Sequence, residues 1–404
     1  MPEKIFQKLD NESLFKCREV ARSWQTIIDR RNYPWLRIVN IPTILKGRNT
    51  YLHLAAGSGQ INIFKTVLNE EVVENVKNER GETSFILACK NGQIKIVELL
   101  MKNHNTDLNA KTKYGNTAFG CACLKGNADI VKILMKNAAF LGINLNTKNA
   151  NGQTAFFLAC QRGQFDVIKI FMEYAWFLNI DLNAKTKKGH TAFFMACKKG
   201  YPYVVKILMA NAAALNIDPS SKDNEGVTGF HWGCINCHSY LVEIFMNNAA
   251  TLGIDLNRKN NDGLTGFHLA CMYSNSNLIK IFMDSKYSNS IDHNRKSNSG
   301  YTAFHYVCQR GKSGLVKIFM ENAAALSIDL HMKNNCGMSG LDIASRKGFT
   351  DVVKIFCLEE KGFALNSVIK GSFRCGQDFH EERICFGNWT GFHKACLIRC
   401  RLIH

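Results

Sequence analysis

The chain has 404 residues, 46% of them hydrophobic, and a net charge of +18; it is longer than one compact core requires and has the composition of a folded protein. It contains no run of about eighteen apolar residues, and its first residues lack the basic and apolar regions of a secretory signal, so we expect neither a membrane span nor secretion. We therefore expect the sixteen cysteines to be reduced thiols, in the cytoplasm or the nucleus. The positive charge favours acidic partners.

Residues 1–38 are predicted to form two or three short helices, because apolar residues recur at helical spacing on both sides of a polar turn at 10–13. So few and such short helices cannot bury a core alone. The apolar positions are Ile5, Phe6, Leu9, Leu14, Cys17, Val20, Trp24, Ile27 and Ile28.

This segment resembles an F-box, whose pattern has an Ile-Phe pair, two leucines, a Val-x-x-x-Trp group and a later tryptophan, matched here by Trp35. The resemblance implies docking on the adaptor subunit of a cullin-based ubiquitin ligase, while the rest of the chain holds a substrate. The family's leading Leu-Pro has no counterpart ahead of the Ile-Phe pair. The other interpretation is that these helices only shield the first repeat. The adaptor-binding residues implied are Ile5, Leu9, Leu14, Val20 and Trp24.

After a linker at 39–47, one unit repeats nine times over 48–358, with one step of 34 residues and then six of 37. Each unit begins with a glycine suited to a tight turn, followed two residues later by a threonine that can cap a helix. A short apolar helix, a second glycine and a longer amphipathic helix complete it. The first glycines are Gly81, Gly115, Gly152, Gly189, Gly226, Gly263, Gly300 and, in weaker form, Gly337.

These units resemble the ankyrin repeat, with its Gly-x-Thr-Pro-Leu-His-x-Ala-Ala phrase. The resemblance implies an all-α solenoid of helix–turn–helix units joined by β-hairpin-type turns, and a chain that binds partners and catalyses nothing. Alanine, glycine or serine replaces the proline, and the unit is about four residues longer than usual. We expect a second helix one turn longer, with a leucine packed inward, at Leu141, Leu178, Leu215, Leu252 and Leu326.

Cysteines and histidines recur at fixed slots of the repeat. Seven cysteines lie six residues after the cap threonine, which predicts a small buried position rather than a metal or redox site. The histidines fill the family's His slot, which implies bonds to neighbouring backbone, and a whole repeat separates them. The cysteines are Cys89, Cys123, Cys160, Cys197, Cys234, Cys271 and Cys308; the histidines are His53, His231, His268, His305 and His393.

Basic residues recur at two slots. A lysine of the second helix, at 65, 132, 169, 206, 280, 317 and 354, is predicted to face solvent. The others end the first helix beside the groove that the resemblance implies, and they favour an acidic protein partner. Nucleic acid fits less well, because the pattern is scattered lysine without interleaved exposed aromatics. The groove residues are Lys125, Arg162, Lys199, Arg310 and Lys347.

Residues 359–404 lose the register, although Thr390–Cys396 forms a partial tenth unit. A zinc site there is an alternative to a repeat, but the spacing lacks the paired Cys-x-x-Cys that zinc sites prefer. We find no catalytic motif and expect no cofactor. The residues that could ligate a metal are Cys375, His380, Cys385, His393, Cys396 and Cys400.

Two functions remain open. The first is a substrate receptor of a cullin-based ubiquitin ligase, in which the F-box-like segment binds the adaptor and the repeats bind the target. The second is an ankyrin scaffold that binds acidic proteins without a ubiquitin role.

Overall fold

The computed structural model describes residues 49–68, 75–273, 275–287 and 290–359. The linker, the partial tenth repeat and the C-terminal cysteines and histidines lie outside these ranges. So do the predicted adaptor-binding residues Ile5, Leu9, Leu14, Val20 and Trp24.

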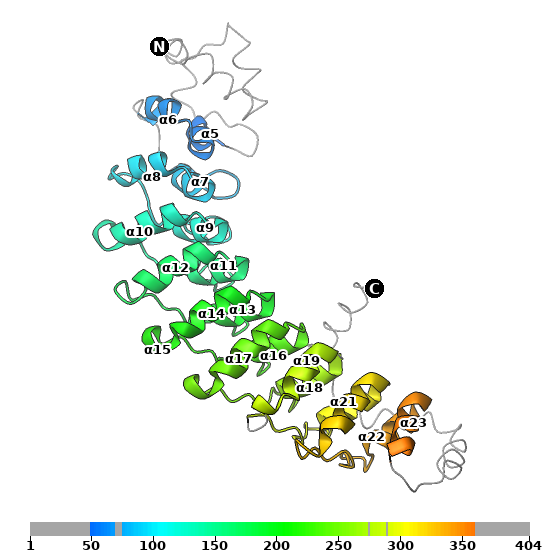
Figure 1. Ribbon diagram of the computed structural model, residues 1–404. Helices are drawn as coiled ribbons and strands as arrows, with labels where there is room; N and C mark the ends of the chain where they lie inside the picture. The colour runs from blue at the N-terminus through cyan, green and yellow to red at the C-terminus, as the bar shows by residue number, and fades with distance from the viewer. Residues whose placement is uncertain (1–48, 69–74, 274, 288–289, 360–404) are drawn as a thin grey trace. The chain divides into compact units, whose positions relative to one another are not determined.

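The described chain forms nine helix pairs, which divide into two compact units (Figure 1). The first unit contains the described residues up to Ala196 and Tyr203–Asp218; the second contains Cys197–Pro202 and the described residues from Pro219. The first helices of the pairs are α5 (Tyr51–Ser58), α7 (Ser84–Asn91), α9 (Ala118–Lys125), α11 (Ala155–Arg162), α13 (Ala192–Lys199), α16 (Gly229–Ile235), α18 (Gly266–Tyr273), α20 (Ala303–Gln309) and α22 (Gly340–Arg346).

The second helices follow after a glycine turn or its equivalent. They are α6 (Ile61–Leu68), α8 (Ile94–Met101), α10 (Ala128–Leu141), α12 (Phe165–Tyr174), α14 (Pro202–Ala210) with α15 (Ala212–Leu215), α17 (Ser239–Leu252), α19 (Ser276–Phe282) with the 3-10 turn η1 (Ser285–Tyr287), α21 (Ser313–Ala323) and α23 (Thr350–Glu359). Apart from isolated bridge residues, namely Lys111 with Thr117 and also Asn49, these described ranges contain helices, turns and irregular loops, which confirms the all-α class.

The caps form as the sequence predicts. Thr154 has an extended backbone, and its hydroxyl accepts the Phe157 N–H at 3.2 Å, so α11 begins without a proline. Gly163 ends the helix with a φ of 67°. The turn glycine is equally constrained: Gly115 has a φ of 79°, and a Cβ there would lie 2.9 Å from the Ala150 backbone nitrogen. Glycine therefore allows the turns of successive repeats to approach closely.

The predicted extra helical turn forms in some repeats. Helices α10 and α17 have 14 residues each and end at Leu141 and Leu252. In the fifth repeat the same stretch breaks into α14 and α15, and after α12 it forms turns. The leucine is only half-buried, because the alanine three residues earlier takes the inner position. The buried alanines are Ala138, Ala175, Ala212 and Ala249.

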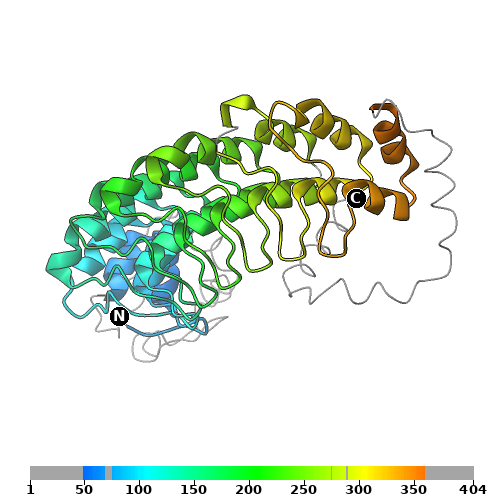
Figure 2. The ribbon, with the colours of Figure 1, turned by 90° about the horizontal axis from the view of Figure 1, so that it is seen from below.

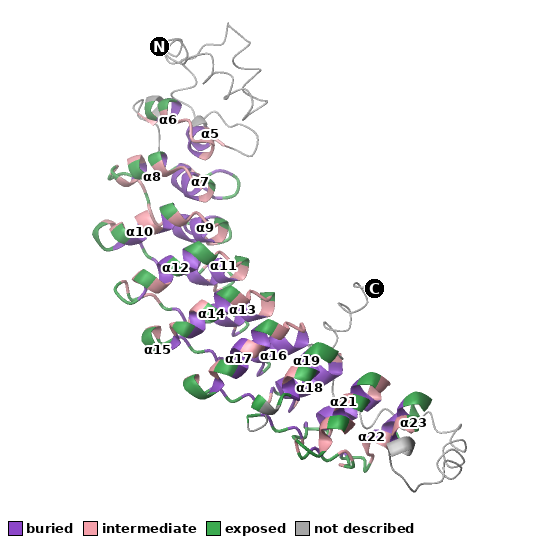
Figure 3. Cartoon of the chain, in the orientation of Figure 1, coloured by how far each residue is buried: buried purple, intermediate pink, exposed green. Residues whose placement is uncertain are grey.

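Within each unit the helices stack in two layers. In the first unit, α5, α7, α9 and α11 pack in succession, and α6, α8, α10 and α12 form the second row. In the second unit the rows are α16, α18, α20, α22 and α17, α19, α21, α23. The loops between repeats, which we call fingers, project away from the second row, as Figure 2 shows for the second unit. The core lies between the rows and between successive pairs (Figure 3).

Phenylalanines fill this core. The ring centroids of Phe156 and Phe171 lie 4.9 Å apart within one repeat, and those of Phe119 and Phe171, which belong to successive repeats, lie 5.9 Å apart. Such rings bury large apolar areas and add specific edge contacts. Because phenylalanine rings of successive repeats pack against each other, one repeat alone cannot bury its apolar face.

Asparagines tie the repeats together at the ends of the second helices. Asn146 donates its side-chain amide to the Asn179 carbonyl and accepts the Asp181 N–H, each at 3.0 Å. The bonds join backbone groups of the following repeat that would otherwise need water. Asparagines with equivalent bonds are Asn75, Asn109, Asn183, Asn257 and Asn294.

Candidate binding surface

The five predicted groove residues end the first helices and are all exposed. Lys125 and Arg162 are the last residues of α9 and α11, which pack against each other in the first unit. Lys199, Arg310 and Lys347 belong to the second unit, at the C-terminal ends of α13, α20 and α22. A cation there also interacts favourably with the helix dipole, so a binding role needs more than this position.

The C-terminal carbonyls of the first helices are bonded by the next repeat. Asn127 donates its amide to the Cys89 carbonyl at 2.8 Å and to the Lys90 carbonyl at 3.0 Å. Gln164 donates to the Leu124 carbonyl at 3.3 Å. The side-chain amides of Asn127 and Gln164 thus satisfy carbonyls at the C-terminal ends of the first helices. The exposed cations beside them are therefore not needed to bond these carbonyls and can interact with a partner.

A further row of lysines escaped the sequence analysis. Six residues before each cap, at the base of the finger, the chain has lysine in eight successive repeats. Aligning the repeats backwards from the threonine, rather than forwards, would have found them. Six are exposed, and Lys222 and Lys259 are half-buried. The row comprises Lys77, Lys111, Lys148, Lys185, Lys222, Lys259, Lys296 and Lys333.

Basic residues predominate in part of the third to fifth repeats. Their fingers and first helices within the first unit, at 109–128, 145–165 and 182–196, contain no aspartate or glutamate. The acidic residues of these repeats lie on the second helices or the loops after them. We call this surface the basic face. Its eight exposed cations are Lys111, Lys113, Lys125, Lys148, Arg162, Lys185, Lys187 and Lys188.

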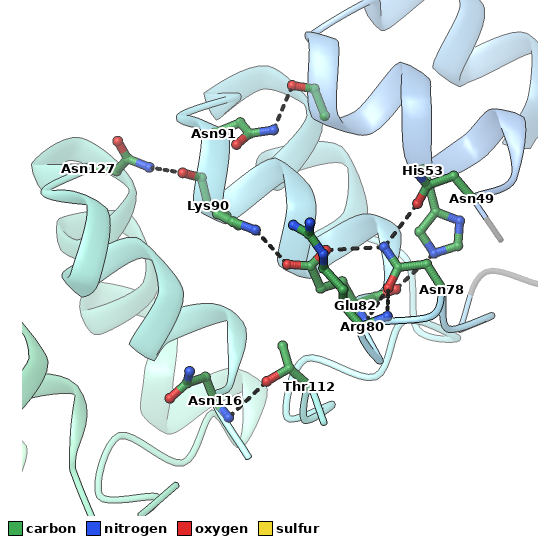
Figure 4. A network of polar contacts seen from close by, with 11 residues as sticks. Asn49, His53, Asn78, Arg80, Glu82, Lys90, Asn91, Thr112, Asn116 and Asn127 are labelled. Atoms are coloured by element: carbon green, nitrogen blue, oxygen red, sulfur yellow. Dashed lines mark hydrogen bonds and ion pairs between the residues drawn. The ribbon is translucent and has the colours of Figure 1, made fainter. Parts of the chain in front are cut away.

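The finger of the second repeat contains two carboxylates, the exposed Glu79 and the buried Glu82, and the charge of Glu82 is compensated (Figure 4). Glu82 is buried, and Lys90 Nζ lies 2.6 Å from its Oε1 while Asn78 donates to Oε2 at 3.1 Å. Burial alone would raise the pKa of the Glu82 carboxyl, but the hydrogen bonds from Lys90 and Asn78 lower it below its ordinary value. The network therefore holds an ionised pair without an outward negative charge.

The repeated cysteines form part of the core. All seven slot cysteines are buried, as predicted. Desolvation raises the pKa of Cys89, Cys123, Cys160, Cys234, Cys271 and Cys308, and burial raises that of the additional Cys121 to about 11. Thiols held protonated are poor nucleophiles and poor metal ligands. Within the ranges that the structure describes, no group of three His, Cys, Asp or Glu side chains could hold a metal ion.

The repeated histidines join one repeat to the next. The Thr228 N–H donates to His231 Nδ1 at 3.1 Å, which leaves Nε2–H to donate to the Arg258 carbonyl at 2.9 Å. His53, His268 and His305 make the same pair of contacts, with carbonyls of Glu82, Tyr301 and Met338. The structural role predicted for these four is confirmed, and His393 lies outside the described residues.

The lysines of the second helix face outward, as predicted: Lys132 is half-buried, and Lys65, Lys169, Lys206, Lys280, Lys317 and Lys354 are exposed. Among the described residues, no helix has the length and apolar character needed to cross a membrane.

The family model for ankyrin repeats matches three segments, at 52–148, 139–223 and 267–369, which together exceed half of the chain. A curated relative, the probable E3 ubiquitin-protein ligase XBOS32 of Oryza sativa subsp. japonica, is 38% identical over 65 residues. That match covers 15% of this chain and 13% of the relative.

Proposed function

Because the chain belongs to the ankyrin-repeat family, a family of protein-binding modules, we propose that it is the substrate receptor of a cullin-based ubiquitin ligase. In this proposal the F-box-like segment binds the ligase adaptor through Ile5, Leu9, Leu14, Val20 and Trp24, and the repeats hold the target. The chain brings the target close to enzymes supplied by other subunits. The local similarity to a probable E3 ubiquitin-protein ligase supports this direction.

The basic face is the observation that carries the substrate half of the proposal. The face presents eight exposed cations in segments whose sequence contains no aspartate or glutamate, and this local excess of positive charge attracts a polyanion. An acidic polypeptide fits better than nucleic acid, because the face has one arginine and, at its finger tips, one large exposed aromatic, Tyr114. Binding of single strands relies on repeated aromatic stacking.

The finger-base lysines also match the geometry of an extended peptide. Lys111, Lys148 and Lys185 recur once in each repeat, and packed helices lie about 8–10 Å apart. An extended chain in the polyproline II conformation advances about 3.1 Å per residue and has three residues per turn, so every third side chain lies on the same face and can meet the next lysine. We therefore expect the target to present an acidic residue at about every third position.

The adaptor half is tested by capture of the full chain on purified adaptor subunit. Wild type is expected to bind, and Leu9→Asp with Leu14→Asp is expected to lose binding. The matched control is Lys113→Glu with Lys187→Glu, which alters the basic face and should bind the adaptor like wild type. If the wild type does not bind the adaptor although its circular dichroism shows normal helices, the ligase role is excluded. The alternative function, an ankyrin scaffold without a ubiquitin role, would then remain.

The substrate half is tested separately by fluorescence anisotropy with a labelled peptide of repeated Glu-Gly-Ser. Lys113→Glu with Lys187→Glu should weaken binding by about tenfold or more, whereas Leu9→Asp with Leu14→Asp should not change it. Binding should also fall as salt rises. Tighter binding of a single-stranded oligonucleotide of equal charge would contradict an acidic protein target.

A further inference from the structure

Three large aromatic side chains protrude together from one edge of the first unit. Phe140 is 89% exposed near the end of α10, where the chain leaves the second row (Figure 3). Trp176 and Phe177 are 72% and 82% exposed in the turns that follow α12, in the next repeat. We call these three residues the aromatic patch.

The fold does not require aromatic residues at these positions. The equivalent slots in other repeats hold small residues that are equally exposed: Ala213, Ala214, Ala250, Thr251, Ala324 and Ala325. A Phe or Trp side chain can bury about 150–250 Å², so the patch offers on the order of 400–500 Å² of aromatic surface. Patches of this size on a folded chain mark interaction sites.

Two residues of opposite charge occupy equivalent positions beside the patch in successive repeats. Lys136 and Glu173 occupy the same slot of successive repeats, four residues before Phe140 and Phe177, and both are exposed. The third repeat therefore presents a phenylalanine beside a cation, and the fourth presents a phenylalanine beside an anion. Equivalent positions with opposite charges are complementary to their own image after a rotation of 180°.

We propose that the aromatic patch is a homodimer interface whose two-fold axis passes between the third and fourth repeats. Phe140 of one copy faces Phe177 of the other, and Trp176 faces the exposed Ala139, which occupies the same slot of the third repeat. The same rotation places Lys136 opposite Glu173 in both halves of the contact. Such an isologous contact is closed, so it makes a dimer and not a fibre.

The size of the patch sets the strength of the association. Two patches bury about 1,000 Å² together, which lies at the lower limit for a specific interface. The dimer is therefore weak and forms reversibly as the concentration rises. The basic face comprises fingers and first helices, whereas Phe140, Trp176 and Phe177 lie at or just after the ends of the second helices and are not part of that face, so the inference does not rest on the proposed function.

The experiment is sedimentation velocity of the full chain over a wide range of concentrations. Wild type is expected to shift from monomer to dimer as concentration increases. Lys136→Glu places two like-charged pairs in the contact and should weaken the association by about tenfold, and Glu173→Lys should do the same. The double variant Lys136→Glu with Glu173→Lys exchanges the charges and should restore the dimer.

Two further variants complete the design. Lys206→Glu changes by the same charge an exposed lysine of α14, which belongs to the fifth repeat and is not part of the patch, and should dimerise like wild type. Phe140→Ala with Phe177→Ala should stay monomeric, with unchanged circular dichroism. A wild type that is monomeric at every concentration, or a charge exchange that fails to restore the dimer, overturns the proposal; so does an equal loss in Lys206→Glu.

Discussion

The two units join their repeats differently at one slot, three residues after the cap threonine. In the sixth to eighth repeats, which belong to the second unit, this slot holds His231, His268 and His305, each 1% exposed and bonded to both the cap and the next repeat; the ninth repeat has Asp342. In repeats two to five the slot holds Ile86, Gly120, Phe157 and Phe194. There the threonine caps the helix without a histidine partner, and the residue in the slot makes no polar contact with the next repeat through its side chain. The first repeat resembles the second unit, because His53 bonds the Glu82 carbonyl of the next repeat.

The fingers differ in the same way. In the second unit Asn261, Asn298 and Asn335 donate their side-chain amides to the carbonyl of the preceding asparagine, starting from Asn224. The same slot of the first unit holds Glu79, Lys113, Ala150 and Lys187. At these two slots the second unit uses polar groups to join its repeats, whereas the first unit has apolar or charged side chains there. The comparison suggests why the basic face occurs in the first unit.

Alanine at the histidine slot should have opposite effects in the two units. His268→Ala removes two buried hydrogen bonds and leaves a cavity, so we expect a loss of about 3 kcal/mol in the free energy of unfolding. Gly120→Ala should instead stabilise by about 0.5–1 kcal/mol, because a Cβ there meets its nearest atom, Leu158 Cδ1, at 3.6 Å. Urea unfolding of both variants measures the difference. A loss in both would mean that Gly120 is required for close packing.

Acid should weaken the second unit before the central repeats of the first. Burial lowers the pKa of His231 and of His268 to about 4, although hydrogen bonds to carbonyls oppose it. A protonated ring would also direct an Nδ1–H at the N–H of the cap threonine. Because the unfolded ring binds a proton near pH 6.5, the stabilisation is complete above that pH and is lost as the pH falls toward 4.

At pH 5 the expected loss is about 2 kcal/mol for each of these two histidines. Hydrogen exchange followed by mass spectrometry, corrected for intrinsic rates, should show α18 losing protection between pH 7 and pH 5 while α11 keeps it. In His231→Gln with His268→Gln the pH dependence should be reduced. Equal losses in both helices would show that general charge repulsion dominates.

Periodicity predicted the fold because each slot has one local physical demand. A positive φ required glycine at Gly115, and a free N–H at the helix start required the hydroxyl of Thr154, so both could be identified without coordinates. The inward leucine was only partly right. Burial at that turn depends on the distance to the next helix, which no single repeat encodes, and Ala138 takes the inner place.

The candidate site was less predictable. Lys125 and Arg162 were found because they end an obvious helix, whereas Lys111 and Lys148 lie in turns without an apolar period. The aromatic patch was missed for another reason: Phe140 and Phe177 continue a helical pattern and look like core residues until their exposure is known. The partner that an exposed surface selects is not determined by its own fold.

The smallest effect we predict concerns the asparagine ladder of the second unit. Asn298→Ala removes the bond to the Asn261 carbonyl, 2.9 Å long, but keeps the backbone bond from Asn298 to Asp262. Because the ladder is exposed, water replaces much of the bond, and the loss should be only about 0.5 kcal/mol. Ala150→Asn places an amide in the same slot of the first unit and should gain a few tenths of a kcal/mol at most. Amide exchange in the fingers measures both, and unchanged exchange in Asn298→Ala would mean that backbone bonds alone align the fingers.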